Sequence, residues 1–118
     1  MLINFTNHPS EYWGDKQLEA AKVYGEIKDI PFPDVSPEDD NEEIKLLADH
    51  YVKEILLIAD NCHVTVHIMG EMTFVYRVVS LLKEQGITCI ASTTVRDAET
   101  ADDGRKISDF QFVKFRRY

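Results

Sequence analysis

Three short segments of the sequence carry side chains that could bind a ligand or do chemistry. They are residues 7–10 (NHPS), residues 70–73 (GEMT) and residues 92–96 (STTVR). Each follows a short apolar run typical of a buried strand. In an open α/β sheet, ligands bind at the carboxyl ends of the strands, where helix amino-ends and free backbone N–H groups collect. We therefore expect the three segments to form one carboxyl-edge rim.

The residue types in this rim suggest an anion site. Arg96 and the backbone at Gly70 and Glu71 are expected to hold phosphate, because helix-start N–H groups and a fixed cation are suited to anions. Ser10 and Thr93 are expected to donate hydrogen bonds, and His8, which titrates near neutral pH, is a candidate for proton transfer. The catalytic candidates are His8, Ser10 and Arg96. The ligand-binding candidates are Asn7, Gly70, Glu71, Thr73, Ser92, Thr93 and Thr94.

Each candidate also has a purely structural alternative. His8 could cap a helix or pack against Trp13. Gly70 and Glu71 could form a tight strand-to-helix turn in which the carboxylate complements the helix dipole. Residues 92–94 could be ordinary strand, since β-branched residues favour that conformation.

The hydrophobic pattern around the rim predicts an α/β fold. Short apolar runs alternate with helical patterns, which favours parallel strands joined by right-handed crossovers. We expect one domain, residues 1–118, forming a three-layer Rossmann-like sandwich with a mostly parallel sheet and a C-terminal antiparallel hairpin. The expected strands are residues 2–6, 26–32 (a sheet edge), 64–69, 87–91 and 110–115, and the expected helices are residues 10–24, 41–56 and 73–85.

Composition excludes several classes of function. The net charge of −8 and pI of about 4.9 would repel duplex nucleic acid and anionic membranes. No stretch has the ~18 apolar residues of a membrane span, so we expect a cytoplasmic protein.

The cysteines and His67 are expected to be structural. Cys62 and Cys89 are expected to be buried free thiols, and His67, which lies inside a strand, is expected to be a core or sheet-face histidine. No metal signature, dinucleotide motif or P-loop is present, so no metal and no cofactor are expected.

Three parts of the sequence, each containing one of the rim segments, give the chain a family resemblance. The sequence NHPS with Trp13 near the start, MGEMTFVYRVV in the middle, and ASTTVR followed by FVKFRRY at the end resemble small single-domain Rossmann-like proteins encoded beside CRISPR systems. These proteins are similar to CARF domains and include ring nucleases. The resemblance covers nearly the whole chain in layout.

The resemblance implies a cyclic oligoadenylate ligand and a homodimer whose two clefts face a shared axis. It further implies cleavage without a metal, in which the protein holds a ribose 2′-hydroxyl in line with its own phosphodiester. The corresponding segments here are residues 7–10, 70–73 and 92–96. The strand-to-helix loop at residues 70–73 lacks the basic residues that such sites often use.

Two other functions fit the sequence. The chain could be a non-catalytic nucleotide-binding module, which would bind the same ligand without turnover. It could also be a small interaction protein whose acidic segment, residues 34–43, docks a basic partner. Cleavage of the ligand would indicate the enzyme, and binding without cleavage would indicate the nucleotide-binding module. Salt-sensitive capture of a partner would indicate the interaction protein.

Overall fold

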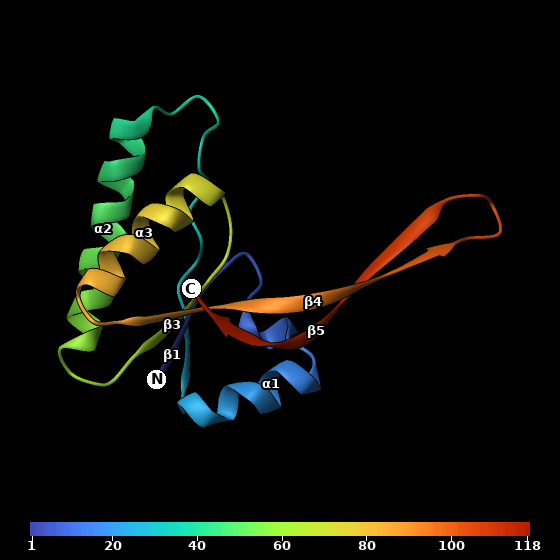
Figure 1. Ribbon diagram of the computed structural model, residues 1–118, viewed down its shortest axis with the longest axis horizontal. Helices are drawn as coiled ribbons and strands as arrows, with labels where there is room; N and C mark the ends of the chain where they lie inside the picture. Colours follow the sequence, from blue (N-terminus) through green and yellow to red (C-terminus); the bar gives the residue numbers. More distant parts are fainter.

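A five-stranded sheet with the order β2-β1-β3-β4-β5 organises the chain (Figure 1). The computed structural model describes the backbone of residues 1–118 and all side chains except those of residues 97–99 and 106–108. Neighbouring strands are parallel except for β4 and β5, which are antiparallel. The expected mostly parallel α/β sandwich with a C-terminal hairpin is therefore confirmed. The strands are β1 (Leu2–Phe5), β2 (Ile27–Asp29), β3 (Thr65–Ile68), β4 (Thr88–Thr100) and β5 (Lys106–Arg117).

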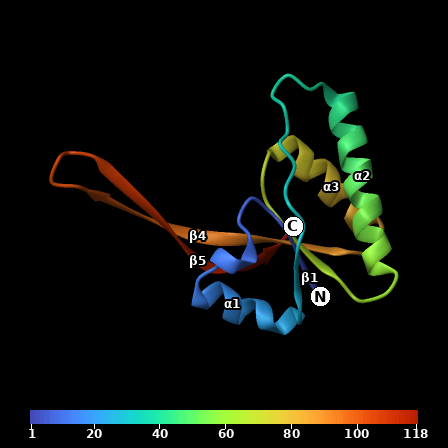
Figure 2. The same ribbon diagram turned by 180° about the vertical axis from the view of Figure 1, so that it is seen from behind.

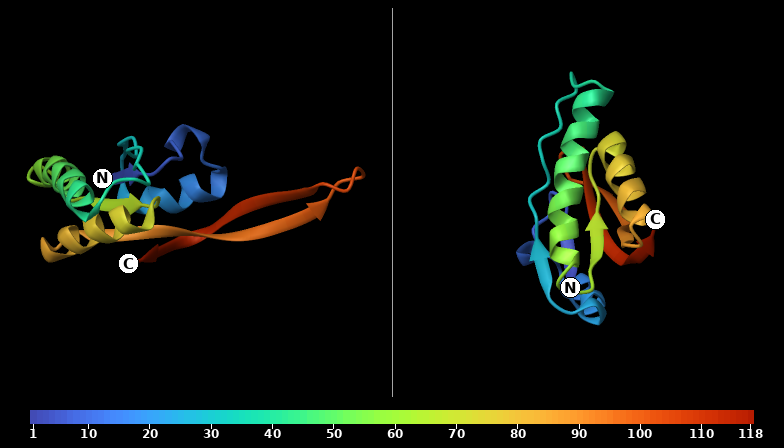
Figure 3. Two further views of the ribbon diagram at one scale, coloured as in Figure 1. Left: turned by 90° about the horizontal axis from the view of Figure 1, so that it is seen from above. Right: turned by 90° about the vertical axis from the view of Figure 1, so that its left-hand side faces the viewer.

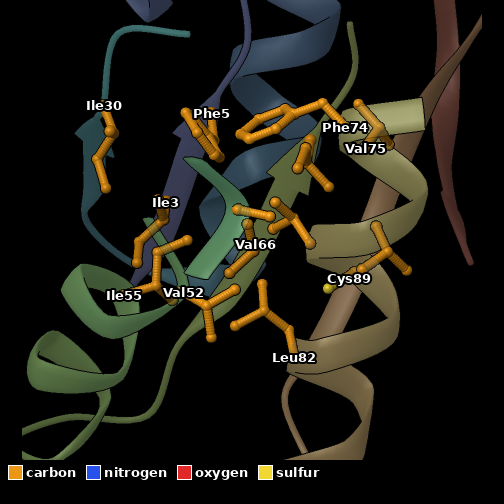
Figure 4. Packing of buried hydrophobic residues seen from close by; sticks show 14 of the residues in the cluster. Ile3, Phe5, Ile30, Val52, Ile55, Val66, Phe74, Val75, Leu82 and Cys89 are labelled. Atoms are coloured by element: carbon orange, nitrogen blue, oxygen red, sulfur yellow. The ribbon is translucent and has the colours of Figure 1, made fainter. Parts of the chain in front are cut away.

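Helices cover both faces of the sheet. The long helices α2 (Asn41–Ala59) and α3 (Met72–Glu84) pack on one face, and the short helix α1 (Asp15–Ala21) packs on the other (Figures 1 and 2). The larger core lies between the sheet and the two long helices. Figure 4 shows how side chains of α2 and α3 meet Ile3, Phe5 and Val66 of the central strands there.

The alternation of side chains along the strands decides which residues face α1. Leu2 of β1 and Ile90 of β4 belong to the smaller apolar core under α1, whereas Ile3 and Val66 belong to the core under the long helices. Successive side chains of a strand point to opposite faces. Asn4 lies two positions after Leu2, and Ser92 lies two positions after Ile90, so both also face α1. His67 is next to Val66 and faces the opposite way, which again is toward α1. The α1 face of the sheet therefore carries a row of polar groups.

Helix α2 is confirmed as an amphipathic helix. Asp40 and Glu43 form a capping box at its start, in which each side chain accepts a hydrogen bond from the other residue's backbone. Its buried residues are Ile44, Ala48, Val52 and Ile55, spaced as one face of a helix requires. Two acids of the segment proposed to dock a basic partner thus have a structural role.

The prediction of one helix over residues 10–24 is wrong. The structure has a 3-10 helix at Ser10–Tyr12, then α1, then a second 3-10 helix at Lys22–Tyr24. Trp13 is extended, with φ −69° and ψ 141°, because its buried indole donates a 3.1 Å hydrogen bond to the His8 carbonyl. The chain restarts its helix only after Gly14. Ser10 is therefore not the cap of α1.

The strand predicted over residues 87–91 is longer in the structure. Strand β4 continues to Thr100, because its β-branched and hydroxyl residues pair with β5 on the way out of the domain. A register shift lies between Thr93 and Thr94. Beyond it the two strands form a ribbon that projects away from the helices (Figures 1 and 2, and the left view of Figure 3). Cys62 departs from expectation too, since it is exposed, whereas Cys89 is buried.

Candidate functional site

The carboxyl edge of the sheet carries a surface pocket beside the central strands. Its volume is about 420 Å³, within the range of roughly 300–1,000 Å³ that small-molecule sites occupy. Asn7 and Glu71 both line it, so the structure brings two of the three expected rim segments together. The remaining wall is the segment after β2, and we call this hollow the switch-point pocket. It is lined by Asn7, Phe32, Pro33, Asp34, Val35 and Glu71.

Gly70 allows Phe32 to pack closely at this pocket. A Cβ atom at Gly70 would lie 2.3 Å from the Phe32 ring. The ring is held in place by Phe5 and Phe74, with ring centroids 5.3 Å away in both cases. The close backbone approach expected at Gly70 is thus made to Phe32.

Replacing Gly70 with Ala is expected to destabilise the domain by about 1–3 kcal/mol, the usual cost of forcing extra volume into a packed site. The added methyl group must push the Phe32 ring away from Phe5 and Phe74. Denaturant unfolding of the purified variant measures the loss. Gly14→Ala is the matched control, since a Cβ there meets no atom within 4 Å. Equal stability of the two variants would contradict the packing role of Gly70.

Glu71 caps helix α3 with its own side chain. Its carboxylate accepts hydrogen bonds from the backbone N–H groups of Thr73 (3.2 Å) and Phe74 (2.8 Å), and from the Thr73 hydroxyl (2.6 Å). These hydrogen bonds, with the Thr73 hydroxyl first, hold the pKa of Glu71 below its usual value. The helix-start N–H groups expected to hold phosphate are therefore already occupied by a carboxylate.

The loop after β1 is tied to strands β1 and β2. The His8 side chain is exposed, but its carbonyl accepts hydrogen bonds from Asn4, at 2.8 Å, and from the Trp13 indole. Ser10 donates to the Asp29 carboxylate through its hydroxyl at 2.7 Å and its backbone N–H at 3.1 Å. Ser10 thus holds the loop on β2.

The residues expected at the third rim segment lie along β4. Ser92 is half-buried, and its hydroxyl lies 2.8 Å from His67 Nε2. The Thr93 hydroxyl pairs with the backbone of Lys114 across the hairpin, at 3.1 and 3.2 Å. Thr94 and Arg96 are exposed on the ribbon, where Arg96 is opposite Phe110. Ser92 is thus hydrogen-bonded to a buried side chain, that of His67.

A chain of hydrogen-bonded side chains crosses the four parallel strands on the α1 face. Asp29 of β2 accepts from Asn4 Nδ2 of β1 at 2.7 Å. Asn4 Oδ1 lies 2.9 Å from His67 Nδ1 of β3, whose Nε2 reaches the Ser92 hydroxyl in β4. We call Asp29, Asn4, His67 and Ser92 the polar chain. It runs from an exposed carboxylate, through two buried groups, to a half-buried hydroxyl.

The partners of Asn4 determine where each proton lies. The Asp29 carboxylate and the His8 carbonyl can only accept, so both must face the amide nitrogen of Asn4. Its oxygen therefore faces His67, and the proton of a neutral His67 ring must be on Nδ1. Nε2 is left as an acceptor, to which the Ser92 hydroxyl donates.

Burial keeps His67 neutral. The ring is 2% exposed and lies edge-on between Trp13 and Phe115, with ring centroids 5.4 and 5.3 Å away. Desolvation lowers the pKa of His67 to about 4. At the other end, partial burial raises the pKa of Asp29, but hydrogen bonds from Asn4 and Ser10 outweigh this effect and hold that pKa below its usual value.

Sequence reasoning missed three members of the polar chain. It assigned no functional part to Asn4 or Asp29, and it placed His67 only in the core or on a sheet face, where the structure indeed has it. The available signal was a polar residue at the third position of two apolar strands: Asn4 in LINF and His67 in TVHI. Their partnership depends on strand order, since Asn4 pairs with Asp29 on one side and His67 on the other.

The part of the chain that the structure describes contains neither a metal cluster nor a membrane-spanning helix. Apart from the undescribed side chains of residues 97–99 and 106–108, no group of three or more His, Cys, Asp or Glu is arranged to hold a metal ion. None of the described helices is both long enough and apolar enough to cross a membrane.

The strand order, the two-sided helix packing and the edge pocket define a Rossmann-like α/β domain with a candidate site at its carboxyl edge. The chain belongs to the uncharacterized protein MJ1673 family, whose model matches residues 1–116. Neither the curated proteins nor the solved structures include a match to this chain.

Proposed function

We propose that this protein binds a cyclic oligoadenylate of CRISPR-linked antiviral defence at the carboxyl edge of its sheet, as a homodimer, and cleaves it without a metal ion. The observation that carries the proposal is the position of the switch-point pocket. Strands β1 and β3 are neighbours, but the connection after β1 leads to α1 on one face and the connection after β3 leads to α3 on the other. Ligands of open α/β sheets bind at this point, outside the carboxyl ends of the strands.

The chemistry of the pocket suits a nucleoside better than a phosphate. Phe32 supplies an apolar wall for a base, and the Asn7 amide can both donate to and accept from a base edge. The carboxylates of Asp34 and Glu71 accept hydrogen bonds from amino or hydroxyl groups and repel anions. Adenosine offers such donors, the exocyclic amine and the ribose hydroxyls. Its phosphates would lie outside the pocket, and Arg96 stays the expected cation for them.

Titration calorimetry with cyclic oligoadenylates of several ring sizes, in EDTA, tests binding, and chromatography of the same mixtures tests cleavage. We expect one ring size to bind with two sites per dimer and to yield a linear product. Phe32→Ala is expected to weaken binding at least tenfold, because it removes the wall against which the base packs. Tyr76→Ala is the matched control, since Tyr76 is an exposed aromatic residue outside the pocket.

Two results would contradict the proposal. One is absence of both binding and linear product with every ring size. The other is an equal loss of binding in the Phe32 and Tyr76 variants, which would place the ligand away from the pocket.

A second candidate is a module that binds the same ligand without turnover. The capping of α3 by Glu71 favours it, because the N–H groups of Thr73 and Phe74 are then not open to a phosphate. This candidate predicts binding with no linear product. Glu71→Gln would keep the cap's hydrogen-bond acceptor while removing a negative charge, and on this candidate it tightens binding without starting cleavage.

A further inference from the structure

The polar chain has the arrangement of a serine activated by a histidine. Serine nucleophiles need a neutral base within hydrogen-bond reach of the hydroxyl, and a third group that fixes the tautomer of that base. Ser92 Oγ lies 2.8 Å from His67 Nε2, and His67 Nδ1 lies 2.9 Å from Asn4 Oδ1. Both distances fall within the range of about 2.6–3.2 Å expected of such pairs.

We propose that Ser92 is a nucleophile, with His67 as its general base and Asn4 as the residue that positions the base, and that it attacks the phosphorus of a phosphodiester. The use of a phosphodiester rests on the proposed function, whereas the reactivity of the hydroxyl does not. Ser92 is the catalytic residue that touches substrate. His67 and Asn4 act through it, and Asp29 holds Asn4 from the far side.

The reaction balances with the groups present. Ser92 Oγ forms a bond to phosphorus as its proton passes to His67 Nε2, and the imidazolium then gives that proton to the departing alkoxide. Water then attacks the phosphorus of the resulting seryl phosphodiester and gives a proton to His67 Nε2. The imidazolium passes a proton to Ser92 Oγ as the Oγ–P bond breaks, which regenerates the hydroxyl and releases a phosphate monoester. The product therefore ends in a monoester, whereas attack by a ribose 2′-hydroxyl gives a 2′,3′-cyclic phosphate.

The surroundings of Ser92 support this role. The Gln17 amide of helix α1 lies 3.4 Å from Ser92 Oγ and can donate to an oxygen of the attacked phosphoryl group. Ser92 is partly exposed, so a substrate can reach it, and the buried His67 ring lies behind it.

Labelling with a fluorophosphonate tests the nucleophile without any nucleotide. Ser92 would displace fluoride from phosphorus, and peptide mass spectrometry would locate the adduct. We expect one adduct, at Ser92, in the wild-type protein and none in Ser92→Ala. His67→Gln is expected to label at least about 100-fold more slowly, as loss of a general base implies. Ser80→Ala is the control, since the Ser80 hydroxyl donates to the Tyr76 carbonyl within α3 and should label as wild type.

The pH dependence of wild-type labelling provides a readout that does not depend on any variant folding. Asn4, Ser92, Trp13 and Phe115 surround the ring without ionising over this range, and Asp29 is the nearest charge along the polar chain. The labelling rate should be constant above about pH 5 and fall in acid as His67 is protonated. Absence of a Ser92 adduct, or labelling of several serines at similar rates, overturns the proposal. Cyclic oligoadenylate binding would be unaffected by that outcome.

Discussion

The free energy of unfolding is expected to fall by about 2 kcal/mol as the pH is lowered from 7 to 5, because His67 is buried as a neutral ring. Its pKa is lowered to about 4 in the folded protein, against 6.5 when unfolded. Between these values the unfolded chain binds more protons, so stability rises with pH. Stability is complete above about pH 6.5 and is lost as the pH falls toward 4. Urea unfolding at pH 7, 6 and 5 measures the change.

His67→Gln supplies the control for this pH effect, since glutamine does not titrate. Its stability should be lower than that of wild type at pH 7 but nearly constant down to pH 5. His63→Gln should keep the wild-type slope, because His63 is exposed. The carboxyl groups of Asp29 and Glu71, whose pKa values are lowered, stabilise the fold above their ordinary values of 3.8 and 4.5. They lose this contribution only as the pH falls below those values, so they add little to the change between pH 7 and 5. A wild-type slope unchanged in His67→Gln would show that another group is responsible.

Replacing Asn4 with Ala is expected to lower the free energy of unfolding by about 3–5 kcal/mol. Asn4 is 1% exposed and bonds four groups: the His8 carbonyl, the Asp29 carboxylate, the Thr6 hydroxyl and the His67 ring. Its loss leaves buried polar atoms without partners, and each such atom costs about 1–3 kcal/mol. Equilibrium unfolding in urea gives the value.

Asn7→Ala is the matched control for Asn4→Ala. The two asparagines are three positions apart, but Asn7 is exposed, so its replacement should change stability by no more than about 0.5 kcal/mol. A loss below about 1 kcal/mol in Asn4→Ala would mean that water replaces the amide, and that the polar chain does not hold the strands together.

The fold class was predictable because apolar periodicity separates helices from strands. The run from Val64 to Gly86 predicted a strand, a turn and a broadly apolar helix, and β3 and α3 lie there. Local pattern could not predict the break at Trp13, because the indole's partner, the His8 carbonyl, is fixed by the strand beneath it. Nor could it predict the length of β4, whose distal residues are paired only with β5.

The loop residues of the candidate site could be predicted from the sequence, whereas the residues of the polar chain could not. Rim residues stand out because they are polar residues after apolar runs, and Asn7 and Glu71 do meet at one pocket. Gly70 packs against Phe32, and Glu71 caps α3. The polar chain joins residues up to 63 positions apart. They meet because their strands are neighbours in the sheet, and the spacing of residues along the sequence does not reveal that strand order.

The tautomer of His67 tests the central claim most directly, because it links the fold to the reactivity of Ser92. In protein labelled with ¹⁵N-histidine, long-range ¹H–¹⁵N correlations at pH 7 distinguish a proton on Nδ1 from one on Nε2. The hydrogen bonds of Asn4 predict a neutral ring with its proton on Nδ1, titrating with a pKa near 4. A proton on Nε2, or a pKa near 6.5, would contradict the polar chain and the nucleophile that depends on it.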